Sequence, residues 1–195
     1  MANIHKVIVV GDKETGKTSL IMKYIDGMFP QNPKLDSSFK RKEVTYNNKK
    51  GHLEIWDTCK GEQQDSLSKL FFRKAECALC VFDMTRKETF ENLEGWISTL
   101  KTNCDHESIP IILVGAKNDE NKKQVTVDQL KNYADEKGVY YFTCATKSYG
   151  DNNYQTIFNK VTELVMNNNN DNNNDSGVDF GEAPVEKKKT TCSLF

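Results

Sequence analysis

Residues 7–20, VIVVGDKETGKTSL, join a run of β-branched apolar residues to a segment with the apolar spacing of a helix. The apolar run, VIVV at 7–10, is typical of a buried parallel strand. The residues between strand and helix, GDKETGKT at 11–18, match the phosphate-binding pattern G-x-x-x-x-G-K-[ST]. Such a pattern can occur by chance in a surface turn. Because a strand precedes it and a helix follows it, we interpret it as a true phosphate-binding loop.

The residue types in this loop suit a polyphosphate bound together with Mg²⁺. Gly11 and Gly16 allow the backbone to approach a β-phosphate closely, so that its N–H groups can point inward. Lys17 can reach the β- and γ-phosphate oxygens, and the Thr18 hydroxyl can ligate Mg²⁺. The other nucleotide-binding residues predicted in this stretch are Asp12, Lys13, Glu14, Thr15 and Ser19.

Length and composition exclude several classes of protein. The chain has 195 residues, enough for one domain with a full core and a tail. Lys and Arg total 27 against 28 Asp and Glu, so the charge balance gives no reason to expect a nucleic-acid partner. No apolar run approaches the roughly 20 residues of a membrane-spanning helix, and the N-terminus lacks the features of a signal peptide. We therefore expect a protein made and kept in the cytosol.

The six cysteines are scattered, as expected for core thiols in a reducing compartment. Cys77 and Cys80 form a C-x-x-C pair, but positions three apart in a strand point to opposite faces. We therefore predict neither a metal site nor a redox site there. His5, His52 and His106 have no obvious partners, and surface positions are expected for all three.

Strand-like and helix-like segments alternate along the chain, which predicts an α/β fold with a mainly parallel sheet. The helix after the phosphate loop should end near Gly27, with a core-facing stripe of Leu20, Ile21, Tyr24, Ile25 and Met28. An exposed loop should follow at 29–38. Two strands, 39–46 and 53–57, should form an antiparallel hairpin around a turn at 47–51, with the first, highly charged strand at the sheet edge. The later predicted elements are a helical stretch near 67–71, strands at 77–84, 111–114 and 139–143, and helices at 90–100, 127–134 and 157–165.

Asp57 follows the apolar residues of the predicted strand 53–57. In a protein with a phosphate loop, a carboxylate at the carboxyl end of a neighbouring strand is where a second Mg²⁺ anchor is expected. The alternative is an ordinary turn residue. Because the carboxyl ends of parallel strands share one edge of the sheet, the loops after Val10, Ile55 and Val114 should converge on one pocket.

The last residues, 167–195, have almost nothing to bury, which predicts a disordered, Asn-rich tail. The tail contains the basic run 187–189 and ends in Cys192-Ser193-Leu194-Phe195, the C-a-a-X form of a prenylation site. A terminal Phe favours geranylgeranyl at Cys192. One lipid chain together with the lysines should hold the protein reversibly on the cytosolic face of a membrane. The alternative is a terminal cysteine without a role. The composition of the tail, the basic run and the position of the cysteine all favour lipidation.

Several of these motifs together resemble small GTPases of the Ras superfamily. The phosphate loop is combined with Trp56-Asp57-Thr58, with a Lys-x-Asp after an apolar strand at 117–119, and with the prenylation box. LFFRKA at 70–75 and FDMTRKETFENLEGW at 82–96 are similar to the Rab branch. The resemblance covers residues 3–166, and we predict a Rab-like G domain at 1–166. It implies a six-stranded, mainly parallel sheet with one antiparallel edge strand and five helices on both faces.

The resemblance also implies a ligand set. GTP or GDP would be held with Mg²⁺, and protein effectors and regulators of membrane traffic would bind through the switch regions. Residues 11–18 would hold the phosphates, and Thr18 and Asp57 would hold the metal, Asp57 through water. Asp119 would accept hydrogen bonds from the guanine base, and Lys117 would pack its stem along the base. The backbone at Cys144, Ala145 and Thr146 would read the guanine O6, and Thr58 and Gly61 would complete the site.

Some positions depart from the family pattern. Ala116 stands where the family has an Asn that contacts the base and ties this loop to the phosphate loop. Loss of such a polar contact should cost about 1 to 3 kcal/mol, or roughly ten- to a hundredfold in affinity. The switch-I Thr that ligates Mg²⁺ in the GTP state falls on Lys34, although Ser37 or Ser38 could replace it if the loop shifts. Lys13 occupies a position beside the γ-phosphate where the family prefers small residues.

The loop after Asp57 lacks the amide that orients the attacking water. Either Lys60 and Gly61 replace the family's Gly and Gln, or one residue is inserted and Glu62 stands at the Gln position. No catalytic residue is assigned, and we predict slow intrinsic GTP hydrolysis. The alternative is a membrane-tethered pseudo-GTPase scaffold that ignores the γ-phosphate, in which GDP and a non-hydrolysable GTP analogue would protect 29–38 equally from protease. An adenine-nucleotide kinase or ATPase is disfavoured by Asp119.

Overall fold

A computed structural model describes residues 3–28, 39–58, 69–105, 109–147 and 151–167. Several predictions concern residues outside these ranges. They are the loop 29–38 with Lys34, Ser37 and Ser38, the residues Lys60, Gly61 and Glu62, His106, and the tail with Cys192.

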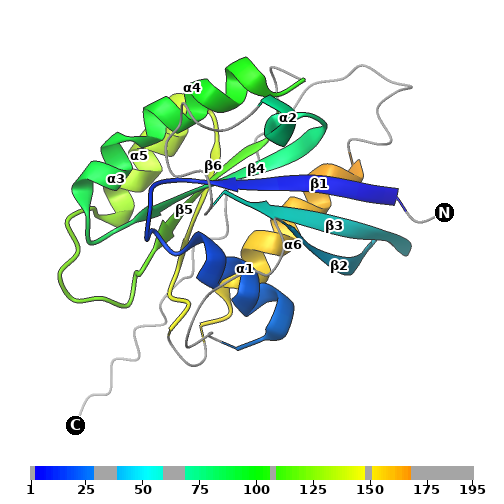
Figure 1. The fold of residues 1–195 in the computed structure, drawn as a ribbon. Helices are drawn as coiled ribbons and strands as arrows, with labels where there is room; N and C mark the ends of the chain where they lie inside the picture. Colours follow the sequence, from blue (N-terminus) through cyan, green and yellow to red (C-terminus); the bar gives the residue numbers. More distant parts are fainter. Residues whose placement is uncertain (1–2, 29–38, 59–68, 106–108, 148–150, 168–195) are drawn as a thin grey trace, which may run out of the picture.

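The centre of the fold is a six-stranded sheet in the order β2-β3-β1-β4-β5-β6 (Figure 1). Neighbouring strands are parallel, except that β2 runs antiparallel to β3 and forms one edge. The predicted α/β fold with one antiparallel edge strand is therefore confirmed. The strands are β1 (Asn3–Val10), β2 (Phe39–Tyr46), β3 (Lys49–Asp57), β4 (Ala75–Asp83), β5 (Ile111–Ala116) and β6 (Tyr140–Cys144).

Helices cover both faces of the sheet (Figure 1). One face carries α1 (Lys17–Asp26) and α6 (Asn153–Asn167), whose apolar side chains share one core with it. The other carries α2 (Lys69–Phe72), α3 (Lys87–Glu91), α4 (Leu93–Asn103) and α5 (Val127–Lys137). The single predicted helix at 90–100 is divided, because α3 and α4 are separated at Asn92.

The apolar run of β1 is buried on both sides, as its composition predicts. Val7 and Val9 pack into the core under α1 and α6, whereas Ile8 and Val10 pack into the opposite core. The same alternation separates Cys77 from Cys80, so the C-x-x-C pair cannot act as one site. Burial raises the pKa of the Cys77 thiol to about 12, which leaves it protonated at neutral pH. Within the described residues no group of three or more His, Cys, Asp or Glu side chains that could hold a metal ion is found.

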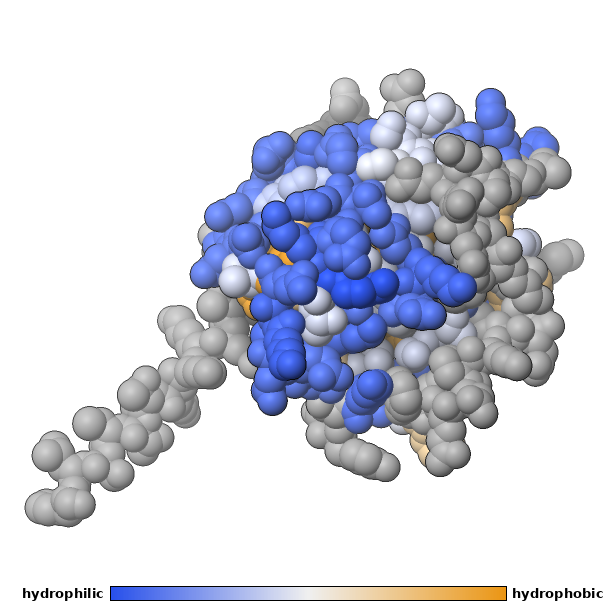
Figure 2. Space-filling view, turned by 60° about the vertical axis from the view of Figure 1, so that its left-hand side comes forward, coloured by the Kyte–Doolittle hydropathy of each residue, from blue (hydrophilic) through white to orange (hydrophobic). Residues whose placement is uncertain are grey.

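The outer surface is mostly hydrophilic. Figure 2 shows only small apolar patches on the side that it presents. Large apolar side chains that are exposed in the described parts are Ile4, Met28 and Val127. None of the described helices combines the length and apolarity needed to cross a bilayer.

The predicted hairpin is confirmed, but its turn is shorter than expected. Asn47 and Asn48 both have positive φ, 47° and 61°, and Tyr46 pairs directly with Lys49. Two positive φ angles in succession define the type I′ turn, which matches the twist of a hairpin and which Asn tolerates well. The predicted turn at 47–51 was therefore wrong, and β3 begins at Lys49 rather than at residue 53.

Two other local predictions also needed correction. The apolar stripe of α1 was expected to include Met28, but the helix ends at Asp26 and Met28 is exposed. Gly27 closes the helix in a left-handed conformation, donating its N–H to the Lys23 carbonyl. His5 is not at the surface: it is 2% exposed, and its Nδ1 lies 2.7 Å from Glu76 Oε2 on the neighbouring strand β4.

Candidate nucleotide-binding site

A pocket of about 410 Å³ lies at the carboxyl ends of the parallel strands. The loops after β1, β3, β5 and β6 contribute to it, as expected where such loops meet at one edge of a sheet. Its described lining residues are Gly11, Lys13, Glu14, Gly16, Lys17, Thr18, Ser19, Thr58, Ala116, Lys117, Asp119, Thr146 and Lys147. Most residues predicted from the sequence to contact a nucleotide are thus brought together. Lys147 was not predicted.

The phosphate loop has a backbone that few residues other than glycine could follow. Gly11 has φ 137°, and a Cβ there would lie 2.0 Å from the Val81 carbonyl oxygen of β4. Gly16 has φ 101° and caps α1, whose first turn begins at Lys17. Thr15 is fully buried, and its hydroxyl donates to the Asp12 carbonyl at 3.0 Å. The loop therefore places the N-terminal end of α1, where helix N–H groups are unpaired, at the pocket.

Lys17 crosses the loop beneath the pocket. Its side chain is almost entirely buried, and Nζ donates to the carbonyls of Gly11 at 2.8 Å and Asp12 at 2.6 Å. These bonds hold a positive charge at the end of a helix that already favours anions. A bound polyphosphate would meet this ammonium group.

Thr18 and Asp57 form the candidate metal position. The Thr18 hydroxyl donates to Asp57 Oδ2 at 2.6 Å, and both residues are buried. A hydroxyl that donates its proton keeps lone pairs for a metal, and Mg²⁺ prefers such oxygen donors together with water and phosphate oxygens. The residues present therefore fit Mg²⁺. Thr58 fixes the chain after Asp57, since its hydroxyl donates to the Val9 carbonyl at 3.0 Å.

Glu14 adds an unfavourable feature to the loop. It has φ 62°, a left-handed conformation that costs a non-glycine residue about 1 to 2 kcal/mol. Its exposed carboxylate-bearing side chain lines the pocket, and so does that of Lys13. A negative charge in a site for phosphate weakens binding, and the neighbouring lysine offsets it in part.

The side of the pocket that is predicted to hold the base is formed after β5 and β6. Lys117 and Asp119 line it, and Asn118 joins the two loops by donating its N–H to the Cys144 carbonyl at 3.2 Å. Thr146 lines the pocket, but Cys144 and Ala145 are buried behind it. The Ala145 N–H donates to Asp151 Oδ2 at 2.6 Å, so a base that uses this N–H must displace a carboxylate of the same chain. Sequence reasoning missed Asp151.

Asp83 is a further residue that the sequence reasoning missed. Its side chain is 1% exposed, and Oδ2 lies 2.5 Å from Lys117 Nζ and 3.2 Å from Arg86 Nε. Burial alone would raise the pKa of this carboxyl group, but hydrogen bonds from Lys117 and Thr85 outweigh it and lower the pKa below its usual value. Asp83 is thus ionised at neutral pH. Its place at the carboxyl end of a buried strand was the available signal, as it was for Asp57.

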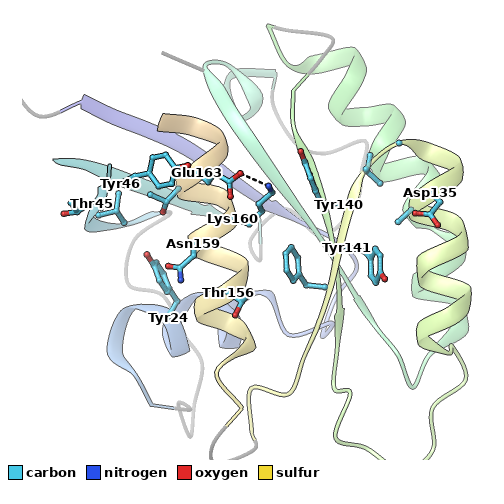
Figure 3. A pocket seen from close by; sticks show the side chains of 16 residues that line it. Tyr24, Thr45, Tyr46, Asp135, Tyr140, Tyr141, Thr156, Asn159, Lys160 and Glu163 are labelled. Carbon is cyan, nitrogen blue, oxygen red and sulfur yellow. Dashed lines mark hydrogen bonds and ion pairs between the residues drawn. The ribbon is translucent and has the colours of Figure 1, made fainter. Parts of the chain in front are cut away.

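A larger hollow, about 1120 Å³, lies elsewhere, and Figure 3 shows the side chains around it. It is lined from α6, β6, β2 and the end of α5, with several tyrosines and the Lys160–Glu163 ion pair at 2.8 Å. Its described lining includes neither the phosphate loop nor the loop after β5. The smaller pocket is therefore the candidate site, because chemistry rather than volume identifies it.

Comparison with known proteins agrees with this geometry. The sequence pattern of the Ras family matches residues 6–167, which include the whole pocket. The chain belongs to the Ras family. This Ras-family protein is similar to Ras-related protein Rab-2B of Dictyostelium discoideum, with 31% identity over 169 residues, 84% of this chain and 81% of that protein.

Other relatives carry Rab-type names as well. Ras-related protein RABG3b of Arabidopsis thaliana is 32% identical over 197 residues, which cover 96% of each chain. Ras-related protein SEC4 of Saccharomyces cerevisiae is 30% identical over 168 residues, 84% of this chain and 76% of that protein. The predicted resemblance is confirmed: this Ras-family protein is a Rab-like small GTPase.

Proposed function

We propose that this Rab-like protein binds GDP and GTP with Mg²⁺ and acts as a switch in membrane traffic. The observation that carries the proposal is the meeting of the phosphate loop, the Thr18–Asp57 pair and the 117–119 loop at one pocket. Lys17 and the N-terminal end of α1 would hold the phosphates. Thr18 would ligate Mg²⁺, and Asp57 would orient the Thr18 hydroxyl and the metal's water. The metal neutralises phosphate charge when bound.

Asp119 would select guanine. Its carboxylate can accept hydrogen bonds from the N1–H and the exocyclic amine of guanine, whereas adenine presents no such pair of donors. A ligand that leaves this carboxylate without hydrogen-bond donors should therefore bind more weakly than guanine. Lys117, held by Asp83, would place its stem beside the base.

Hydrolysis would be slow, because neither alignment of residues 57–62 supplies a Gln to orient water. Attachment to the cytosolic face of a membrane would use a geranylgeranyl group on Cys192 and the lysines at 187–189. In this proposal the G domain covers 1–166, and the Asn-rich tail at 167–195 tethers it.

A cluster of aromatic side chains would receive protein partners. Phe39 stacks on Trp56 with ring centroids 5.0 Å apart, and Phe71 meets Trp56 edge-on at 5.6 Å. All three are only partly buried, and they lie close in sequence to residues 29–38 and 59–68, which would sense the nucleotide. Aromatic residues of this kind commonly anchor protein interfaces.

Guanine selectivity can be tested by thermal unfolding with Mg²⁺ and either GDP or ADP. At a GDP concentration of about one hundred times Kd, the free energy of unfolding should rise by about 2.7 kcal/mol. The melting temperature should then rise by roughly 5 to 10 °C. ADP at the same concentration should have almost no effect.

Asp119→Ala should remove most of the GDP shift, and Asp135→Ala on the exposed surface of α5 is the matched control. Equal shifts with GDP and ADP in the unmodified protein would contradict guanine selectivity.

A further inference from the structure

We propose that Asp83 and Arg86 are positioning residues that connect the phosphate loop to the 117–119 loop, here called the base loop. This connection would prolong the residence of a bound guanine nucleotide. The proposal rests on the proposed function. It assigns a role to residues that are absent from the described lining of the pocket.

Asp83 is the centre of the connection. It ends β4, the strand that lies between β1 and β5, so its side chain is placed between the phosphate loop and the base loop. Oδ1 accepts from the Thr85 N–H at 2.9 Å and the Thr85 hydroxyl at 2.7 Å. These two bonds fix the carboxylate, and Oδ2 is left to accept from Lys117 and Arg86.

Arg86 extends the connection to the phosphate loop. While Nε faces Asp83, Nη2 donates to the Lys13 carbonyl at 2.7 Å. The contacts Lys117 to Asp83, Asp83 to Arg86 and Arg86 to Lys13 therefore join the two loops that grip opposite ends of a nucleotide. Asp83 is buried, which makes these charge-assisted bonds stronger than exposed ion pairs. The planar guanidinium carries separate N–H donors, so Arg86 serves both partners at once.

Asp12 provides a second attachment for the same loop. Its Oδ1 accepts from Trp96 Nε1 at 2.8 Å, and its Oδ2 accepts from Asn92 Nδ2 at 2.7 Å. Asn92 and Trp96 belong to the start of α4, one short helix after Arg86. Consecutive residues of the phosphate loop, Asp12 and Lys13, are thus fixed to the same helical layer. A loop held in this way loses little further freedom when phosphate binds.

Ala116 explains why this connection matters in this chain. Its Cβ lies 3.7 Å from where a Cβ of Gly16 would be, so its side chain faces the phosphate loop. A methyl group in that position can contact the loop but cannot form a hydrogen bond with it. Among the contacts of the described residues, a polar connection between the base loop and the phosphate loop passes through Asp83 and Arg86.

The test is the dissociation rate of a fluorescent GDP, mant-GDP, from full-length protein with Mg²⁺. Arg86→Gln should raise this rate about five- to tenfold, since it removes charge-assisted hydrogen bonds from a partly exposed side chain. Lys87→Gln is the matched control: Lys87 is the next residue, and its ion pair with Glu91 is exposed. The control should leave the rate within about twofold of the unmodified protein.

A second variant separates positioning from general stability. Ala116→Asn introduces a side chain able to bond directly to the phosphate loop, so Arg86→Gln should have a smaller effect on the rate in that background. If Arg86 had only a structural role, Arg86→Gln would lower the melting temperature of the nucleotide-free protein equally with and without Ala116→Asn. Its effect on the dissociation rate of mant-GDP would then be the same in both backgrounds.

If the unmodified protein binds mant-GDP tightly but Arg86→Gln leaves the dissociation rate unchanged, this inference is overturned and the proposed function is not. If the unmodified protein fails to bind mant-GDP, the proposed function is overturned together with it.

Discussion

Replacing Lys17 by alanine should lower the affinity for GDP about a hundredfold, a loss of roughly 2.7 kcal/mol that is typical of hydrogen bonds to a charged group. Lys17 is buried at the end of α1 and is held by the carbonyls of Gly11 and Asp12. The variant loses the ammonium group that, in the proposed function, meets the β-phosphate, and it leaves the two carbonyls without this donor. Titration with mant-GDP in the presence of Mg²⁺ measures the change.

Lys131→Ala is the control for this prediction, because Lys131 is exposed on α5 and is not among the described lining residues of the pocket. It should bind GDP as the unmodified protein does. A Lys17→Ala variant that binds within threefold of the unmodified protein would show that the phosphates lie elsewhere.

Gly11→Ala should reduce the free energy of unfolding by about 3 kcal/mol or more, because overpacking against rigid atoms is costly. The new Cβ would lie 2.0 Å from the Val81 carbonyl oxygen, and this oxygen belongs to a strand in the centre of the sheet. Neither backbone can move without breaking the pairing of β1 with β4. We expect the melting temperature to fall by roughly 6 to 12 °C for a domain of this size.

Gly27→Ala separates the clash from the strain of a positive φ. Gly27 has φ 72°, but a Cβ there would meet nothing within 4 Å. This variant should lose only about 1 kcal/mol. Equal losses in the two variants would mean that close approach of β1 to β4 is not what requires glycine at the start of the phosphate loop.

Residues that recur in a local pattern could be predicted from the sequence. The run VIVV predicted a strand buried on both faces, and Val7 and Ile8 do pack into opposite cores. Asp57 was predicted to be a metal anchor because it ends a strand next to the one that leads into the phosphate loop. In the structure its carboxylate accepts a hydrogen bond from the Thr18 hydroxyl. Strand ends and motif spacing are properties of short segments, so they can be predicted from a single sequence.

Contacts between distant segments could not be predicted in the same way. Arg86 reaches the Lys13 carbonyl, and Asp151 holds the Ala145 N–H, because the fold brings these residues together. His5 appeared to have no partner because Glu76 is 71 positions away in the sequence. The partners of a side chain in a parallel sheet come from neighbouring strands, and between the neighbours β1 and β4 the chain forms α1, β2, β3 and α2.

The nucleotide content of protein purified without added nucleotide tests the central claim most directly. The protein is denatured, and the released bases are separated and quantified by liquid chromatography with mass spectrometry. We expect guanosine phosphates, mostly GDP, at close to one per protein molecule, and almost none in the Lys17→Ala variant. Protein that carries no nucleotide, or that carries adenosine phosphates instead, would contradict the account.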